Sequence, residues 1–184
     1  MEQLLDDGDA YERRDTIILS GNQLPAVSSG EIVPNIVGDL VNKHLSLNIP
    51  VSEINTAHRL GTRKANQAVD RRPIIVKLCR RDTKKSVLIA ARQQPSNAPK
   101  LFVNESLTPK RGTILFALRQ MKKMADSGVK GCTSQDGRIF AFTAPVAGTN
   151  RDRKHLISSH DDLVTFCRDF VKKPLDSFLS EWNH

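Results

Sequence analysis

The chain lacks the cysteine patterns that mark a metal site or a disulfide framework. Its only cysteines are Cys79, Cys132 and Cys167. They are far apart, odd in number and outside any CxxC or Cys/His ligand spacing, which excludes a zinc finger and a disulfide network. Two of them stand in apolar patterns and are expected to pack as small hydrophobic residues. Free cysteines of this kind indicate a reducing intracellular compartment.

Export and membrane signals are also missing. No apolar signal region stands at the N-terminus. No window approaches the roughly 20 apolar residues that a spanning helix needs. We therefore expect no membrane partner.

The chain also lacks the sequence motifs of common enzyme classes. The five histidines are scattered, and there is no HExxH, GxSxG or P-loop pattern. The run Ser159-His160-Asp161 is contiguous, whereas catalytic triads assemble in space, so helix capping explains it better. The acidic run 6–9 (DDGD) lacks the roughly 12-residue ligand spacing of a calcium loop. We expect no catalytic residue, no metal and no cofactor, and an enzyme is the least favoured alternative.

Positive charge, in contrast, is concentrated in one stretch. Residues 54–142 hold 19 Lys and Arg against 5 Asp and Glu, a local charge of 19 − 5 = +14. The rest of the chain has 9 against 15, or −6, and the two sum to the net +8. Excess charge that only aids solubility usually spreads over the chain. Its concentration here favours a polyanionic partner, with nucleic acid as the leading candidate.

Hydrophobic periodicity predicts an α+β fold. Strands are expected at 15–21, 54–60, 73–78 and 101–104, and helices at 31–45 and 83–92, the second capped by Asp82. The order β-α-β-β-α-β is that of a ferredoxin-like, or RNA-recognition-motif-like, domain. Its two helices would cover one face of the sheet and leave the other open.

A second, smaller α+β domain is expected to follow. Thr108 and Pro109 signal the start of a basic helix, and Asp136-Gly137 signals a hairpin between 131–134 and 139–142. A linker is expected at 144–153 and a helix capped by Ser159 after it. The predicted organisation is therefore a residual helix or coiled-coil end (1–14), the ferredoxin-like domain (15–104), the second domain (105–171) and an amphipathic tail (172–184).

Few aromatic residues are available for binding. They make up 5% of the chain, and the expected first and third strands, DTIILSG and RPIIVKL, contain none. Recognition-motif sheets bind bases by stacking on aromatics in those strands, so stacking there is not the main binding mode. Phosphate contacts by Lys and Arg remain, which give salt-dependent binding with little sequence preference. An ordinary solvated charge stays the alternative for each candidate contact: His58, Arg59, Lys77, Arg80, Arg81, Arg111, Arg119, Lys122, Lys123, Lys130 and Arg138.

Four segments resemble a known family: YERRDTIILSG (11–21), INTAHRLG (54–61), RRPIIVKL (71–78) and VNESLTPKRGTILFALRQMKK (103–123). They are similar to the first-open-reading-frame proteins of LINE-type retrotransposons and to the C-terminal region of the baculovirus FP protein. The resemblance covers about 11–142 and is most specific at HRLG and NESLTP. In that family a coiled coil precedes a recognition-motif-like domain and a small C-terminal domain.

The resemblance implies a function for this chain. It implies non-catalytic, cooperative binding of single-stranded RNA or DNA, nucleic-acid chaperone activity and ribonucleoprotein assembly, in the cytoplasm and also in the nucleus. The YxRR segment then suggests Arg13 and Arg14 as contacts, HRLG suggests Arg59, and LTPxR suggests Arg111. The chain has no long heptad region, so self-association would depend on a truncated coil.

A second function stays open at this point. The segment 174–184 carries an apolar stripe with Trp182, which suits a protein-interaction or assembly module of a viral or host factor as well as packing on the last helix. No small-molecule substrate is indicated.

Overall fold

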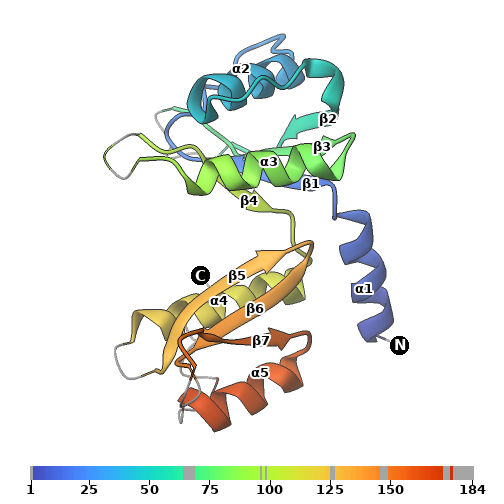
Figure 1. Cartoon of the computed structure of the whole chain (residues 1–184). Helices are drawn as coiled ribbons and strands as arrows, with labels where there is room; N and C mark the ends of the chain where they lie inside the picture. The colour runs from blue at the N-terminus through green and yellow to red at the C-terminus, as the bar shows by residue number, and fades with distance from the viewer. Residues whose placement is uncertain are drawn as a thin grey trace. The chain divides into compact units, whose positions relative to one another are not determined.

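The protein is an α+β chain with two antiparallel sheets. The computed structural model describes residues 2–63, 69–95, 97, 99–124, 127–145, 149–171 and 175. Within these residues there are five α-helices, and the chain divides into two compact units. The four-stranded unit is Arg13–Ser106, and the three-stranded unit joins residues 2–12 to the described residues from Leu107 onward (Figure 1). No helix in the described ranges is long and apolar enough to cross a membrane.

The four-stranded unit has the element order that the periodicity predicts. It contains β1 (Thr16–Ser20), α2 (Val33–Leu45), a 3-10 turn (Val51–Glu53), β2 (Ile54–Arg59), β3 (Ile74–Leu78), α3 (Arg81–Arg92) and β4 (Phe102–Glu105). The sheet order is β2-β3-β1-β4, and every neighbouring pair is antiparallel.

Strand alternation gives this sheet one buried face. Ile17 and Leu19 of β1 are fully buried, and so are Ile74 and Val76 of β3. They form one core with Val37, Leu40 and Val41 of α2 and Val87 of α3, so both helices cover the same face (Figure 1). Each such side chain contributes about 1.5–3 kcal/mol on burial. The opposite face of the sheet carries no helix among the described residues of this unit.

The predicted start of α3 is wrong by two residues. Asp82 was expected to cap the helix, but the N-cap is Arg80, without a side-chain cap, and the helix begins at Arg81. Asp82 therefore lies inside the first turn. Its carboxylate still stabilises the helix there, because it faces the positive end of the helix dipole.

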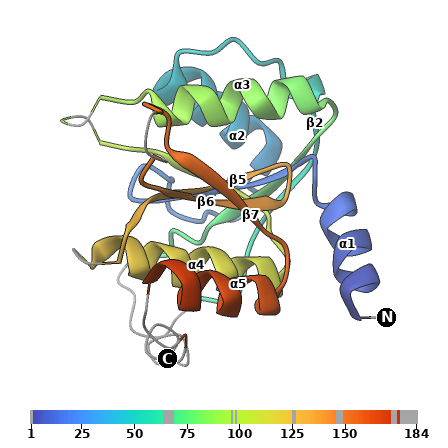
Figure 2. The same ribbon diagram turned by 60° about the horizontal axis from the view of Figure 1, so that its bottom comes forward.

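The three-stranded unit contains α1 (Glu2–Glu12), α4 (Pro109–Lys123), β5 (Val129–Gln135), β6 (Arg138–Thr143), β7 (Arg153–Ile157) and α5 (His160–Phe166), followed by a π-helical turn (Cys167–Val171). The antiparallel sheet has the order β5-β6-β7. The helices α4 and α5 lie side by side along this sheet (Figure 2).

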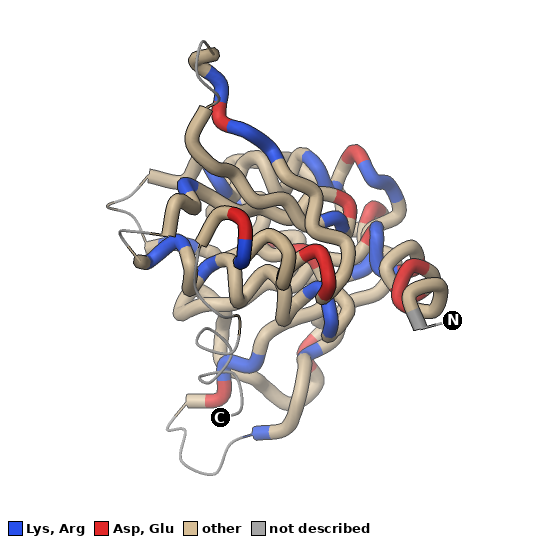
Figure 3. Tube along the Cα trace, turned by 90° about the horizontal axis from the view of Figure 1, so that it is seen from below, with Lys and Arg blue, Asp and Glu red and all other residues tan. Residues whose placement is uncertain are grey.

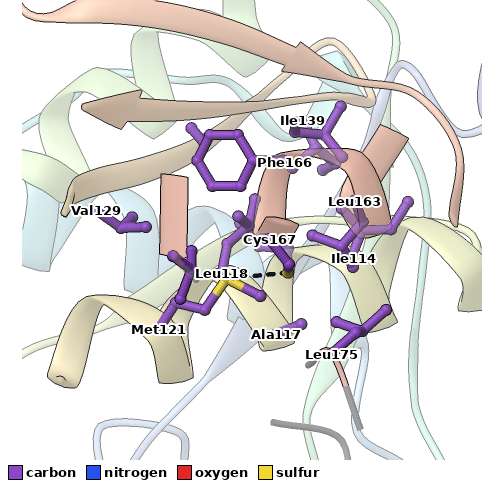
Figure 4. Close-up of a cluster of buried hydrophobic side chains, with 14 residues drawn as sticks. Ile114, Ala117, Leu118, Met121, Val129, Ile139, Leu163, Phe166, Cys167 and Leu175 are labelled. Atoms are coloured by element: carbon purple, nitrogen blue, oxygen red, sulfur yellow. Dashed lines mark hydrogen bonds between the residues drawn. The ribbon is translucent and has the colours of Figure 1, made fainter. Parts of the chain in front are cut away.

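The core of this unit lies between the sheet and those two helices. Leu118 and Met121 of α4 pack with Ile139 of β6 and with Leu163 and Cys167 after β7 (Figure 4). Cys167 Sγ lies 3.9 Å from the sulfur of Met121. Burial raises the pKa of the Cys167 thiol to about 11, so this cysteine packs as a protonated hydrophobic group.

Local start and turn signals are confirmed in this unit. Thr108 caps α4 by accepting a hydrogen bond from the Arg111 amide, and Ser159 caps α5 in a capping box with Asp162. Asp136 and Gly137 both have positive φ, 52° and 77°. Two such residues in succession make the tight turn that joins twisted antiparallel strands.

Two parts of the predicted organisation differ from the structure. The linker expected at 144–153 ends in a strand, β7, because Arg153–Ile157 pairs with β6. The segment 1–14 was predicted as a residual helix or coiled-coil end outside both domains; Glu2–Glu12 is a helix, α1, and it groups with the three-stranded unit. The predicted tail 172–184 lies outside the described residues except for Leu175, which is buried in the core of that unit.

Candidate nucleic-acid interface

The open face of the four-stranded sheet carries two of the predicted cationic contacts. His58 of β2 stands opposite Ile75 of β3, and Lys77 stands two residues further along β3. Since neighbours opposite each other and residues two apart share a face, both point away from the helices. Both side chains are exposed. They are therefore available to a ligand on this face.

Arg59 has a different environment because it follows His58 by one residue. It pairs with the buried Ile74 and so lies on the covered face. Its side chain is 5% exposed and donates to both oxygens of Glu31, at 2.9 and 3.0 Å. It also donates to the carbonyl oxygens of Arg72 and Pro25, each at 3.1 Å. The hydrogen bonds from Arg59 hold the pKa of the Glu31 carboxyl below its usual range.

Two further predicted contacts lie at the start of α3. Arg80 pairs with Glu53 at 2.6 Å but its side chain remains 71% exposed. Arg81 is 48% exposed and lies 3.7 Å from Asp15, beyond hydrogen-bond distance. Hydrogen bonds from Thr83 and Arg80 lower the pKa of Glu53. Both guanidinium groups keep donors that face solvent.

Arg13 and Arg14 precede β1 and are half-buried. Arg13 donates to the Ser106 hydroxyl at 3.5 Å, and Arg14 lies 3.7 Å from Asp15. The Arg14 carbonyl oxygen accepts a hydrogen bond from the Lys84 ammonium at 2.7 Å. The structure thus ties this segment to Ser106, just after β4, through a weak side-chain contact and to Lys84 of α3 through a short hydrogen bond to the backbone.

Arg111 lies in a buried cluster of the three-stranded unit. It donates to Asp6 at 2.8 Å, to Asp7, and to the Gly137 carbonyl oxygen at 2.9 Å. The Thr108 hydroxyl donates to the other oxygen of Asp6. Burial alone would raise the pKa of Asp6, but the hydrogen bonds from Thr108 and Arg111 and the nearby positive charges outweigh it and lower that pKa.

The remaining predicted contacts in this unit are exposed. Arg119, Lys122 and Lys123 lie three and four residues apart, which places them on one side of α4. Lys130 pairs with Asp152 at 3.3 Å on the surface, where such a pair adds little stability. Arg138 opens β6 beside the hairpin turn.

The structure therefore brings the candidates together in separate groups. His58 and Lys77 share a sheet face, Arg80 and Arg81 flank the start of α3, and Arg119, Lys122 and Lys123 share a helix side. Figure 3 shows Lys and Arg spread over both units and acidic residues on the helix beside the N-terminus. Arg59 and Arg111 are engaged by carboxylates inside their own units.

The sequence did not predict the buried ion pairs of the two units. Lys84 is 1% exposed and pairs with Glu105 at 2.7 Å. Position 84 faces the sheet because it stands three residues before Val87 on α3, and that spacing is the one signal the sequence offers. Glu105 and Asp6 come from segments distant in sequence from Lys84 and Arg111, which periodicity does not connect.

Comparison with known proteins adds no assignment: no protein-family model matches the chain, and no curated protein matches it. Within the described part of the chain, no group of three or more His, Cys, Asp or Glu side chains is placed to hold a metal ion.

Proposed function

We propose that the protein is a non-catalytic, largely sequence-tolerant binder of single-stranded RNA or DNA. In this proposal it belongs with the LINE-type first-open-reading-frame proteins and serves as a chaperone or in ribonucleoprotein assembly. The four-stranded unit would be a ferredoxin-like, recognition-motif-like domain. Its β-α-β-β-α-β order and its sheet order β2-β3-β1-β4 support that fold.

One observation carries the proposal: the +14 segment keeps most of its predicted contacts exposed after folding. His58, Lys77, Arg80 and Arg81 in one unit are exposed. Arg119, Lys122, Lys123 and Arg138 in the other unit are exposed as well. Exposed ammonium and guanidinium groups bind phosphates without reading bases, which suits a strand of any sequence.

The proposed interface leaves out Arg59 and Arg111. Each is nearly buried and bonded to carboxylates of its own unit. Releasing either to a phosphate would leave a buried acid without its cation, which is costly. We therefore assign them to the scaffold that presents the exposed cations.

Fluorescence anisotropy with labelled single strands tests this function. Binding is expected to be tight at low salt and to fall steeply as salt is added, because each phosphate contact releases counterions. Strands of different sequence should bind within a few-fold of each other, and the label should stay on an intact strand. Weak binding at low salt, no loss with salt, or cleavage of the strand would overturn the proposal.

A second function is favoured by α1. Leu4, Leu5 and Tyr11 are 76%, 70% and 62% exposed on this helix. Exposed apolar side chains on a helix suit packing against another helix, as in an assembly module or a short coil. Light scattering of the chain and of a Leu4→Glu/Leu5→Glu variant tests it, because a smaller particle in the variant would show association through α1.

A further inference from the structure

The open face of the three-stranded sheet carries partly exposed aromatic side chains. Ile139 and Ala141 of β6 and Ile157 of β7 point into the core beneath α4 and α5. Alternation then places Phe140 and Phe142 on the other face of β6. Both rings are partly exposed. This face therefore presents two aromatic side chains that do not belong to the buried core.

Register identifies the neighbours of the two rings. Phe140 lies between Thr133 of β5 and Leu156 of β7, and Phe142 lies between Gly131 and Lys154. Leu156 is 50% exposed. Gly131 has no side chain to cover the flank of Phe142, and a Cβ there would contact that ring at 3.7 Å. The rings thus lie on a shallow apolar surface, and the flank of Phe142 that faces Gly131 is left open by that glycine.

Positive charge borders this surface. The Lys154 ammonium lies 3.8 Å from the centroid of the Phe140 ring. Arg138 shares the face at the hairpin end of β6, two residues before Phe140. The paired residues of this face are Gly131, Thr133, Gln135, Arg138, Phe140, Phe142, Lys154 and Leu156, none of them acidic. An acid, Asp152, stands two residues before Lys154, and Lys130 pairs with it at 3.3 Å. Single-strand binders combine aromatic rings with neighbouring cations in this way, and the acid beside them here, Asp152, is paired with Lys130.

We propose that this face stacks the bases of a single strand on Phe140 and Phe142, with Lys154 and Arg138 on the flanking phosphates. The proposal rests on the proposed function and adds a base-contacting surface to it. Lys154 would leave the Phe140 ring for a phosphate when a base takes its place. Rings two residues apart on a strand are about 6.6 Å apart, roughly twice the 3.4 Å rise of a B-form strand. Successive bases must therefore be unstacked, which favours a single strand over a duplex.

A comparison of two ligands on the unchanged protein is the first test. One is a labelled single strand, and the other is a strand of equal length whose sugars lack bases. Both carry the same phosphates, so phosphate contacts alone would bind them equally. Stacking on two rings predicts at least about fivefold tighter binding of the strand with bases, with the same salt slope for both.

Substitution locates the effect. Phe140→Leu and Phe142→Leu keep an apolar side chain and remove the ring, so each should weaken binding of the normal strand and leave the base-free strand unchanged. Phe102→Leu is the comparison variant, since Phe102 is 55% exposed on the open face of the other sheet. A loss of binding in Phe102→Leu, with none in the other two variants, would place the stacking on that sheet and overturn the inference. Photocrosslinking of a halogenated strand adds a readout without mutation. Crosslinks are expected in the tryptic peptide 139–151, and not in 101–110, which contains Phe102.

The outcomes separate this inference from the proposed function. If the unchanged protein binds neither ligand at low salt, the proposed function fails. If it binds both equally and the Phe140 and Phe142 variants match Phe102→Leu, phosphate binding stands and the stacking face is wrong. If the Phe140 and Phe142 variants instead reduce the particle size in light scattering and leave binding unchanged, the face packs against another copy of the chain, which also overturns the inference.

Discussion

The two units use buried charge in different ways. In the four-stranded unit, Lys84 and Glu105 are 1% and 3% exposed and lie inside a continuous apolar core. In the three-stranded unit, Arg111 and Asp6 are 11% and 7% exposed and join α4 to α1. Among the described side chains of α1, only Asp6 and Ala10 are buried. The first pair thus lies within an apolar core, whereas the second joins a helix that buries little apolar surface to the rest of its unit.

This difference determines what should fail when each pair is broken. Among the described side chains of α1, the one buried apolar group is the methyl of Ala10, and its burial contributes about 1 kcal/mol at most. We therefore expect charged hydrogen bonds to contribute most of the attachment of α1. Loss of Lys84 should reduce the stability of the whole four-stranded unit. Loss of Arg111 should release α1 and disturb the remainder of its unit less.

The largest effect is expected for Lys84→Met. The change removes the cation from a buried carboxylate, and breaking such pairs costs about 3–5 kcal/mol. Urea unfolding should show the loss, and Lys84→Met/Glu105→Leu should recover most of it, since apolar replacement of both partners is nearly neutral. A loss below about 1 kcal/mol, typical of an exposed pair, would contradict the comparison.

Arg111→Gln is expected to have the next largest effect. Each charged hydrogen bond lost costs about 1.5–3 kcal/mol, and the change should appear as faster amide hydrogen exchange in Glu2–Glu12. Arg119→Gln, on the exposed side of the same helix, is the control and should leave that exchange unchanged. If α1 keeps its protection in Arg111→Gln, apolar contacts rather than the ion pair attach this helix.

Local signals explain which parts of the fold could be predicted. Thr108-Pro109, Ser159 and Asp136-Gly137 act through backbone groups within a few residues, so the sequence alone located two helix starts and a hairpin. The strand β7 was missed because Arg153–Ile157 begins with two charged residues and becomes a strand through pairing with β6. The residues of Arg153–Ile157 alone do not indicate which strand they pair with.

The candidate site shows the same difference between local features, which the sequence predicts, and long-range contacts, which it does not. Clusters of Lys and Arg are visible in the sequence, but their engagement is not, because Glu31 lies 28 residues from Arg59 and Asp6 lies 105 from Arg111. The side of the sheet on which Arg59 lies needs the register with Ile74. Charge density was therefore predictable, whereas the separation of exposed cations from internal ones required the structure.

Acid should weaken the attachment of α1. The pKa of Asp6 is lowered below its ordinary value of 3.8, so its contribution is complete above that value and is lost as pH falls through the folded-state pKa. Asp6→Asn should therefore lower stability at pH 7 and differ less from the unchanged protein near pH 3. An equal difference at both values would show that the charge of Asp6 does not stabilise the unit.

The smallest effect on stability is expected for Lys122→Glu/Lys123→Glu, although this variant should weaken nucleic-acid binding. Both side chains are exposed in the last turn of α4, where surface changes usually stay within about 0.5 kcal/mol. Binding should weaken uniformly across sequences, with the salt slope reduced by about 2, one for each phosphate contact. Lys43→Glu is the matched control, because Lys43 is also exposed in the last turn of a helix but lies outside residues 54–142. Lys43→Glu changes the net charge by half as much as the double variant, so a rise in log Kd of about half that of the double variant would show that net charge, and not the basic segment, drives binding. An altered preference among sequences would contradict phosphate contact at α4.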